Sequence, residues 1–218
     1  ESSTAVTLSL LSEHGDQGFP GNLSIKVEYL LTEDNELMMN YTAKTDAATP
    51  INITNHAYFS LGESSGELLD LQVNASSMLE RKDNGLPSGK VISVEQTDFD
   101  FQQTVNIGQR QQETQDKSLQ EMQCYDHCFV LNHNDIGIAD AVLTSPNNKV
   151  RMTLYTDQLA VQLYTGVALT PPFSPYQGVC LEAQNYTNAI NIPHFPNSVL
   201  TPESEYKQSI IYHFESIK

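Results

Sequence analysis

Residues 23–29 read Leu-Ser-Ile-Lys-Val-Glu-Tyr, with apolar and polar side chains in strict alternation. Successive side chains of a β-strand point to opposite faces, so this stretch predicts a half-buried strand. The same period recurs at residues 6–10, 37–41, 150–154 and 159–163, and residues 209–214 form another strand candidate. Turn-forming clusters rich in Gly, Pro, Asn and Asp separate the strands, at residues 14–21, 83–87 and 145–148. Many strands joined by short turns predict an all-β fold, an antiparallel β-sandwich.

One stretch permits a helix. Residues 109–123 contain few apolar side chains besides Leu119 and Met122, which is too sparse for a core-facing stripe and predicts a surface loop or a short surface helix. No internal repeat and no shift in composition marks a linker. Since β-sandwiches of 218 residues commonly form one domain, we expect residues 1–218 to form a single domain.

The charge balance is acidic, with 27 Asp and Glu against 11 Lys and Arg and a formal net charge of −16. The basic residues form no run that could follow a phosphate backbone, so no nucleic acid is expected as a partner. Anionic membrane surfaces and phosphorylated substrates are disfavoured for the same reason. No apolar stretch reaches the roughly 18 residues of a membrane span, and the first residues do not resemble a signal peptide. We expect a soluble protein with a neutral ligand.

Three cysteine residues, Cys124, Cys128 and Cys180, are an odd number in a long chain. This count favours free thiols in a reducing compartment, and therefore a cytoplasmic location. Cys124 and Cys128 lie four residues apart with His127 and His133 nearby, which raises the possibility of a zinc site. Closed zinc sites usually need paired spacings and a fourth ligand, so we predict no metal.

Three segments are predicted to be strands that combine an apolar face with an unusual polar one. Residues 51–59, 159–164 and 179–184 each alternate, and their polar positions include His56, Gln162, Tyr164 and Glu182. Such a face can hydrogen-bond the hydroxyls of a sugar while an aromatic ring covers its C–H face. The solvated face of an antiparallel sheet is also polar without any function. Because Lys and Arg are nearly absent from these segments, a semi-buried carbohydrate site is the favoured interpretation.

Four blocks in this order resemble the aldose 1-epimerase family: GDQGFPGNL at residues 15–23, TNHAYFSL at 54–61, YDHCFVL at 125–131, and GVCLEAQNY at 178–186 followed by Asn191, Pro193, Phe195 and Pro196. Ser60 replaces the usual asparagine of the second block. The match covers nearly the whole chain. The resemblance implies a galactose mutarotase-like supersandwich.

The resemblance also implies roles for four residues. His56 matches the general acid of the family and Glu182 the general base, whereas Asp126 and Gln162 match residues that contact the sugar. The implied reaction opens and recloses the ring of free hexoses such as galactose and glucose, and so interconverts their α and β anomers. It needs no cofactor and no metal.

The sequence departs from the family upstream of the first block. The family segment there carries an arginine and a second histidine of the sugar site, and neither has a counterpart. The resemblance therefore implies an N-terminally incomplete domain, with a companion chain or the missing N-terminal segment completing the sandwich. One alternative is a catalytically inactive carbohydrate-binding module or fragment of the same fold. Another is a sugar-phosphate epimerase, which would place arginines at the phosphate, and none accompanies these motifs.

Overall fold

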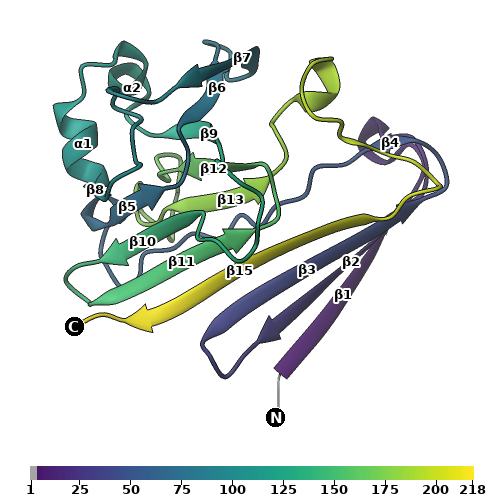
Figure 1. The fold of residues 1–218 in the computed structure, drawn as a ribbon, viewed down its shortest axis with the longest axis horizontal. Helices are drawn as coiled ribbons and strands as arrows, with labels where there is room; N and C mark the ends of the chain where they lie inside the picture. Colours follow the sequence, from purple (N-terminus) through teal and green to yellow (C-terminus); the bar gives the residue numbers. More distant parts are fainter. Residues whose placement is uncertain (1–3) are drawn as a thin grey trace.

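The computed structural model describes residues 4–218 and is built almost entirely from antiparallel strands (Figure 1). The larger sheet has eight strands in the order β1 (Thr4–Ser12), β2 (Leu23–Leu31), β3 (Glu36–Thr45), β15 (Tyr206–Ser216), β11 (Val150–Thr156), β10 (Ala141–Ser145), β5 (Asp70–Val73) and β8 (Val105–Asn106). The smaller sheet has five, in the order β13 (Cys180–Gln184), β12 (Ala160–Tyr164), β9 (Asp126–Val130), β6 (Ser77–Arg81) and β7 (Pro87–Ser93). A short pair joins β14 (Val199–Leu200) to β4 (Thr49–Pro50). The predicted all-β antiparallel fold is confirmed.

The main core lies where the two sheets face each other, and it holds β13 in place. Leu181 and Ala183 of β13 belong to this core together with Ile210 and Tyr212 of β15. Two side chains of β15 also bond the backbone of β13: the Tyr212 hydroxyl donates to the carbonyl of Leu181 at 3.0 Å, and Gln208 Nε2 donates to that of Ala183 at 3.0 Å. Because these bonds satisfy buried polar groups, they fix β13 against the larger sheet.

The helix-permissive stretch forms two short helices, α1 (Ile107–Glu113) and α2 (Lys117–Met122). The side chain of Asn106 caps α1 and that of Asp116 caps α2, each accepting a hydrogen bond from a backbone N–H of the first turn. Leu119 is fully buried, so one apolar residue is enough to anchor α2. Three 3₁₀ turns, η1 (Asp16–Gly18), η2 (Gly66–Leu68) and η3 (Ala189–Asn191), complete the secondary structure. No helix within residues 4–218 is long and apolar enough to cross a membrane.

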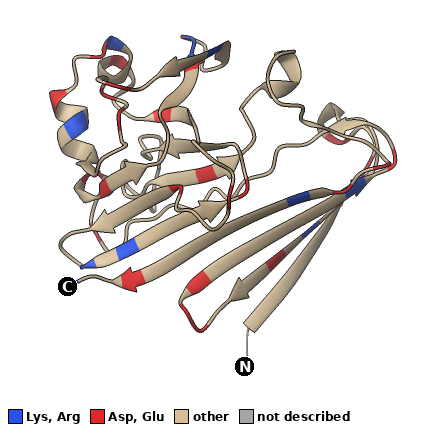
Figure 2. Ribbon diagram, in the orientation of Figure 1, with Lys and Arg blue, Asp and Glu red and all other residues tan. Residues whose placement is uncertain are grey.

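Strands β1, β2 and β3 extend away from the two-sheet body (Figure 1). Residues 6–10 do form a strand, but the expectation that it is half-buried is wrong. Val6, Leu8 and Leu10 are 53%, 55% and 63% exposed, and they lie opposite Tyr29, Val27 and Ile25 of β2. Strand β1 also contains no charged residue, and its ribbon in Figure 2 is tan throughout. The edge of the larger sheet at β1 is therefore apolar on one face, and it has no charged side chains that would oppose pairing with another strand.

We expect the chain to self-associate through β1, because an uncharged edge strand with an uncovered apolar face is a template for further pairing. Leu8→Lys places a charge on the apolar face and should lower the associated fraction several-fold in sedimentation velocity. Thr7→Lys, on the opposite face of the same strand, adds the same charge to the same edge and is the matched control. If the two variants behave alike, the apolar face does not drive the association.

The carboxyl group of Asp140 is expected to make stability depend on pH. Asp140 is fully buried, and burial raises its pKa from 3.8 to about 7 against the lowering effect of a 2.7 Å hydrogen bond from the Thr156 amide. A raised folded-state pKa means that the native state binds the proton more tightly, so its contribution to stability is complete below 3.8 and is lost as pH rises to about 7.

Asp140→Asn removes this titration and keeps an oxygen for the Thr156 amide. Urea unfolding should show the wild type losing up to ~4 kcal/mol relative to the variant over that pH range, since one pKa unit corresponds to ~1.4 kcal/mol. Two titratable groups lie near Asp140: His133, with Nδ1 at 3.6 Å from Asp140 Oδ1, and Asp157, whose charge also raises the pKa of Asp140. A difference that does not change with pH would mean that Asp140 stays ionised beside His133.

Candidate active site

The register of β12 with its neighbours brings three of the predicted residues to one face of the smaller sheet. Gln162 lies directly opposite Glu182 of β13, and Tyr164 lies opposite Asp126 of β9. Side chains directly opposite each other point to the same face, and positions two apart along a strand share it as well. Gln162, Glu182 and Asp126 therefore share the face that alternation predicts for the first two. Asp126 is the first residue of its strand.

His56 reaches this face from a segment that is not a strand. The expected strand at residues 51–59 is wrong: only Phe59 makes a bridge, to Val179, with both backbone bonds at 2.9 Å. Asn52 instead bonds the backbone of Asn185, and the side chain of Asn55 accepts from the amide of Ala57. Asparagine side chains that bond nearby backbone compete with a strand ladder, which explains the irregular path.

The imidazole of His56 contacts the carboxylate of Glu182 despite that path. The distance from His56 Nε2 to Glu182 Oε1 is 3.2 Å, with side chains 52% and 9% exposed, respectively. The other ring nitrogen, Nδ1, lies 3.4 Å from the Cys180 sulfur. The ring of Tyr58 is centred 5.1 Å from that of His56, and the ring of Tyr164 6.2 Å from it. His56 therefore has an open side towards solvent and defined neighbours at both nitrogens.

Burial is the largest influence on the pKa of Glu182. It raises the pKa of Glu182, the charge of His56 lowers that pKa, and the charge of Asp126 raises it further, so that the net direction is upward. Burial also raises the pKa of the Cys180 thiol well above its ordinary value, with Glu182 contributing in the same direction. Cys180 therefore stays a protonated thiol at neutral pH and is not poised as a nucleophile.

Asp126 and Gln162 form a second, polar cluster on the same face. Gln162 Nε2 donates a 2.7 Å hydrogen bond to Asp126 Oδ1. Arg81, at the end of β6, lies on the other side of the carboxylate, with Nη2 at 3.8 Å from Asp126 Oδ2. A hollow of about 130 Å³ adjoins the cluster, and its lining includes Arg81, Asp126, Gln162 and Asn188. Arg81 was not predicted from the sequence, because β6 carries none of the family blocks.

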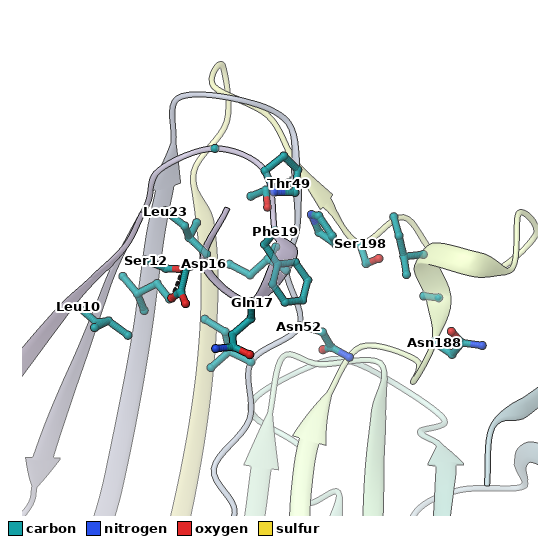
Figure 3. A pocket seen from close by; sticks show the side chains of 18 of the residues that line it. Leu10, Ser12, Asp16, Gln17, Phe19, Leu23, Thr49, Asn52, Asn188 and Ser198 are labelled. Carbon is teal, nitrogen blue, oxygen red and sulfur yellow. Dashed lines mark hydrogen bonds between the residues drawn. The ribbon is translucent and has the colours of Figure 1, made fainter. Parts of the chain in front are cut away.

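A larger cavity, of about 450 Å³, lies elsewhere and contains none of the four predicted site residues. Figure 3 shows it between Leu10 and Leu23 of the protruding strands and Asn188 and Ser198 of the loops beyond β13. Its lining is mainly apolar and continues the uncovered face of β1 and β2. The volume of a cavity alone therefore does not identify the candidate active site, which is defined by the contact between His56 and Glu182.

The metal-binding side chains that lie close together are not those considered for zinc from the sequence, which were Cys124, Cys128, His127 and His133. Within residues 4–218, the group of metal-binding side chains whose ligand atoms lie within 4.8 Å of one another is His56, Cys180 and Glu182. Cys180 faces Nδ1 of the histidine and Glu182 faces Nε2, on different edges of the ring. A single ion can bind only one of these nitrogens, so the observed ring orientation suits a hydrogen-bonded pair better than a metal centre.

Comparison with solved structures defines the class of fold. A GalM/aldose epimerase homologue from C. elegans superposes with a TM-score of 0.89 at 24% identity, covering 98% of this chain and 66% of that one. Galactose 1-epimerase from Lactobacillus acidophilus NCFM superposes with a TM-score of 0.88 at 31% identity, covering 99% of this chain and 64% of that one. The fold is therefore that of the galactose mutarotase-like β-sandwiches.

Sequence comparison gives the family. Galactose mutarotase from Sus scrofa is 33% identical over 225 residues, and aldose 1-epimerase from Escherichia coli K12 is 34% identical over 221 residues. These matches cover 97% and 96% of this chain, which spans 63% of the length of each relative. The profile of the family described as aldose 1-epimerase matches residues 1–213. The chain belongs to the aldose 1-epimerase family.

Proposed function

We propose that this chain carries the acid and base of an aldose 1-epimerase that interconverts the α and β anomers of free hexoses such as galactose and glucose. The observation that carries the proposal is the 3.2 Å contact between His56 Nε2 and Glu182 Oε1. A half-exposed imidazole and a buried carboxylate of this kind can exchange protons with a bound ligand. The names of the relatives, galactose mutarotase and aldose 1-epimerase, support the same activity.

In the proposed mechanism, Glu182 takes the proton from the anomeric hydroxyl while His56, as imidazolium, protonates the ring oxygen. The ring opens to an aldehyde, and rotation about the bond between C1 and C2 presents the opposite face of the carbonyl. Reclosure with both proton transfers reversed gives the other anomer. The raised pKa of Glu182 supports this assignment, because a base works best when its pKa lies near the working pH.

Asp126 and Gln162 are the proposed substrate-binding residues. Their mutual hydrogen bond uses Gln162 Nε2 and Asp126 Oδ1, and leaves Gln162 Oε1 and Asp126 Oδ2 as acceptors for sugar hydroxyls. The rings of Tyr58 and Tyr164, beside His56, can pack against the C–H face of the sugar. Acceptors and aromatic rings together favour a neutral, hydroxyl-rich ligand.

We also propose that residues 1–218 act as a single domain, and that a companion chain or an N-terminal segment completes the sandwich over β1 and β2. The uncovered apolar side chains Val6, Leu8 and Leu10 support this proposal. A covering element would bury them and remove the free edge of the sheet. The cytoplasmic location stays a prediction from the number of cysteine residues.

Polarimetry on freshly dissolved α-D-galactose and α-D-glucose tests the function. The protein should accelerate the decay of optical rotation towards equilibrium in a saturable manner, above the rate with buffer alone. Saturable sugar binding without acceleration would instead indicate a catalytically inactive carbohydrate-binding module. The absence of both binding and acceleration would overturn the proposal.

A further inference from the structure

Arg81 lies on the site face of the smaller sheet although no sequence motif includes it. The register between β6 and β7 shifts between Leu79 and Arg81. Such irregularities change the direction of a side chain and are common beside active sites. The Arg81 side chain is 24% exposed, and its Nη2 lies 3.8 Å from Asp126 Oδ2. The sequence offered no arginine near the sugar site, whereas the fold brings one to its rim.

Arg81 and Asp126 face each other with unused hydrogen-bonding capacity. Their separation of 3.8 Å is too long for a direct hydrogen bond. Asp126 Oδ1 is occupied by Gln162, whereas Oδ2 and the guanidinium have no hydrogen-bond partner among residues 4–218. Both groups line the same hollow of about 130 Å³. A hydroxyl there can accept from Arg81 and donate to Asp126 at the same time.

The turn after β6 holds the guanidinium in place. Gly85 has φ +85°, and a Cβ at this position would lie 3.2 Å from Arg81 Nη2. Two backbone bonds close the turn, from Lys82 N to Leu86 O and from Gly85 N to Lys82 O, both at 2.9 Å. The arginine is thus confined between this turn and Asp126, which lowers the entropy cost of using it to bind a ligand.

We propose that Arg81 is a substrate-binding residue that, with Asp126 Oδ2, clamps one hydroxyl of the sugar beside the reaction centre. This inference rests on the proposed function and extends it to a residue outside the family blocks. Since the carboxylate of Asp126 offsets the positive charge of Arg81, the pair suits an uncharged hydroxyl better than a phosphate or carboxylate group. Arg81 therefore contributes to the choice among neutral sugars.

Affinity for D-galactose and its monodeoxy derivatives, measured by titration calorimetry, tests the clamp. Arg81→Met should weaken binding of galactose roughly ten-fold or more, as for a lost hydrogen bond to a charged group. One deoxy derivative, lacking the clamped hydroxyl, should bind wild type and Arg81→Met almost equally. The remaining derivatives should lose as much affinity as galactose does. Arg81→Lys, which keeps the charge, should recover part of the loss.

Lys90→Met is the matched control, since Lys90 is 72% exposed and pairs with Glu80 away from the site. It should leave every affinity unchanged. If Arg81→Met weakens all the sugars by one common factor, Arg81 is only structural and the inference fails. If it weakens none, the inference fails while the proposed function stands. If wild type binds no sugar at all, both fail together.

Discussion

Glu182→Gln is expected to lower the catalysed rate of anomer interconversion by about 10²–10⁴-fold, the usual contribution of a general base. Glutamine has nearly the same shape and can still hydrogen-bond a hydroxyl, but it cannot take the proton of the anomeric hydroxyl. Sugar affinity should therefore change little. Polarimetric rates over a range of galactose concentrations separate the two quantities, because the loss should fall on kcat and not on KM.

Unfolding measurements on the same variant test whether loss of fold is the cause. Burial raises the folded-state pKa of Glu182 above its ordinary value of 4.5, so the stability that its carboxyl contributes is lost as pH rises through the folded pKa. The neutral Gln side chain avoids this loss, and the variant should be at least as stable as wild type at neutral pH. Glu80→Gln is the control, because it removes the carboxylate that pairs with Lys90. An unchanged rate in Glu182→Gln would refute the base assignment.

His56→Asn should lower the rate by a similar factor of about 10²–10⁴ because asparagine cannot donate a proton to the ring oxygen. The His56 side chain is 52% exposed, so the space it vacates is open to solvent. Added imidazole should then restore part of the rate in a concentration-dependent manner, which a merely structural defect would not allow. Polarimetry with and without imidazole provides the measurement.

The control for this variant is His194→Asn, since His194 is exposed and its Nε2 lies 2.6 Å from the carbonyl oxygen of Gly89. It should retain full activity. The double variant that lacks both His56 and Glu182 should be no less active than the less active of the two single variants. The effects of replacing an acid and a base that act in one step are strongly non-additive. Additive losses would place the two residues in separate steps.

Alternation predicted the strands of the site well where a full ladder forms. In β12 and β13 every residue has a partner on the neighbouring strand, and Gln162 and Glu182 lie opposite each other on the expected face. The same rule failed at residues 51–59, where the Asn52 and Asn55 side chains take the backbone bonds that a strand would need. Alternation therefore predicts side-chain direction only where neighbouring strands supply the hydrogen bonds.

Two other features could not be predicted from the sequence. For β1, alternation identified Leu8 as a residue of the apolar face but could not tell whether anything covers that face. For Arg81, proximity to Asp126 depends on the pairing of β6 with β9, which alternation within either strand cannot reveal. Both depend on contacts between segments distant in sequence. The role of His56, by contrast, was predicted from a motif, although the secondary structure predicted for residues 51–59 was wrong.

The short contact between Nε2 of His56 and Oε1 of Glu182 has a consequence for how turnover would be completed. If the open-chain aldehyde leaves before the ring recloses, the carboxyl group keeps the proton that the imidazole has lost. At 3.2 Å that proton can return directly from oxygen to nitrogen. The resting state is then regenerated inside the protein without exchange with bulk acid or base, so turnover should be insensitive to buffer concentration at fixed pH.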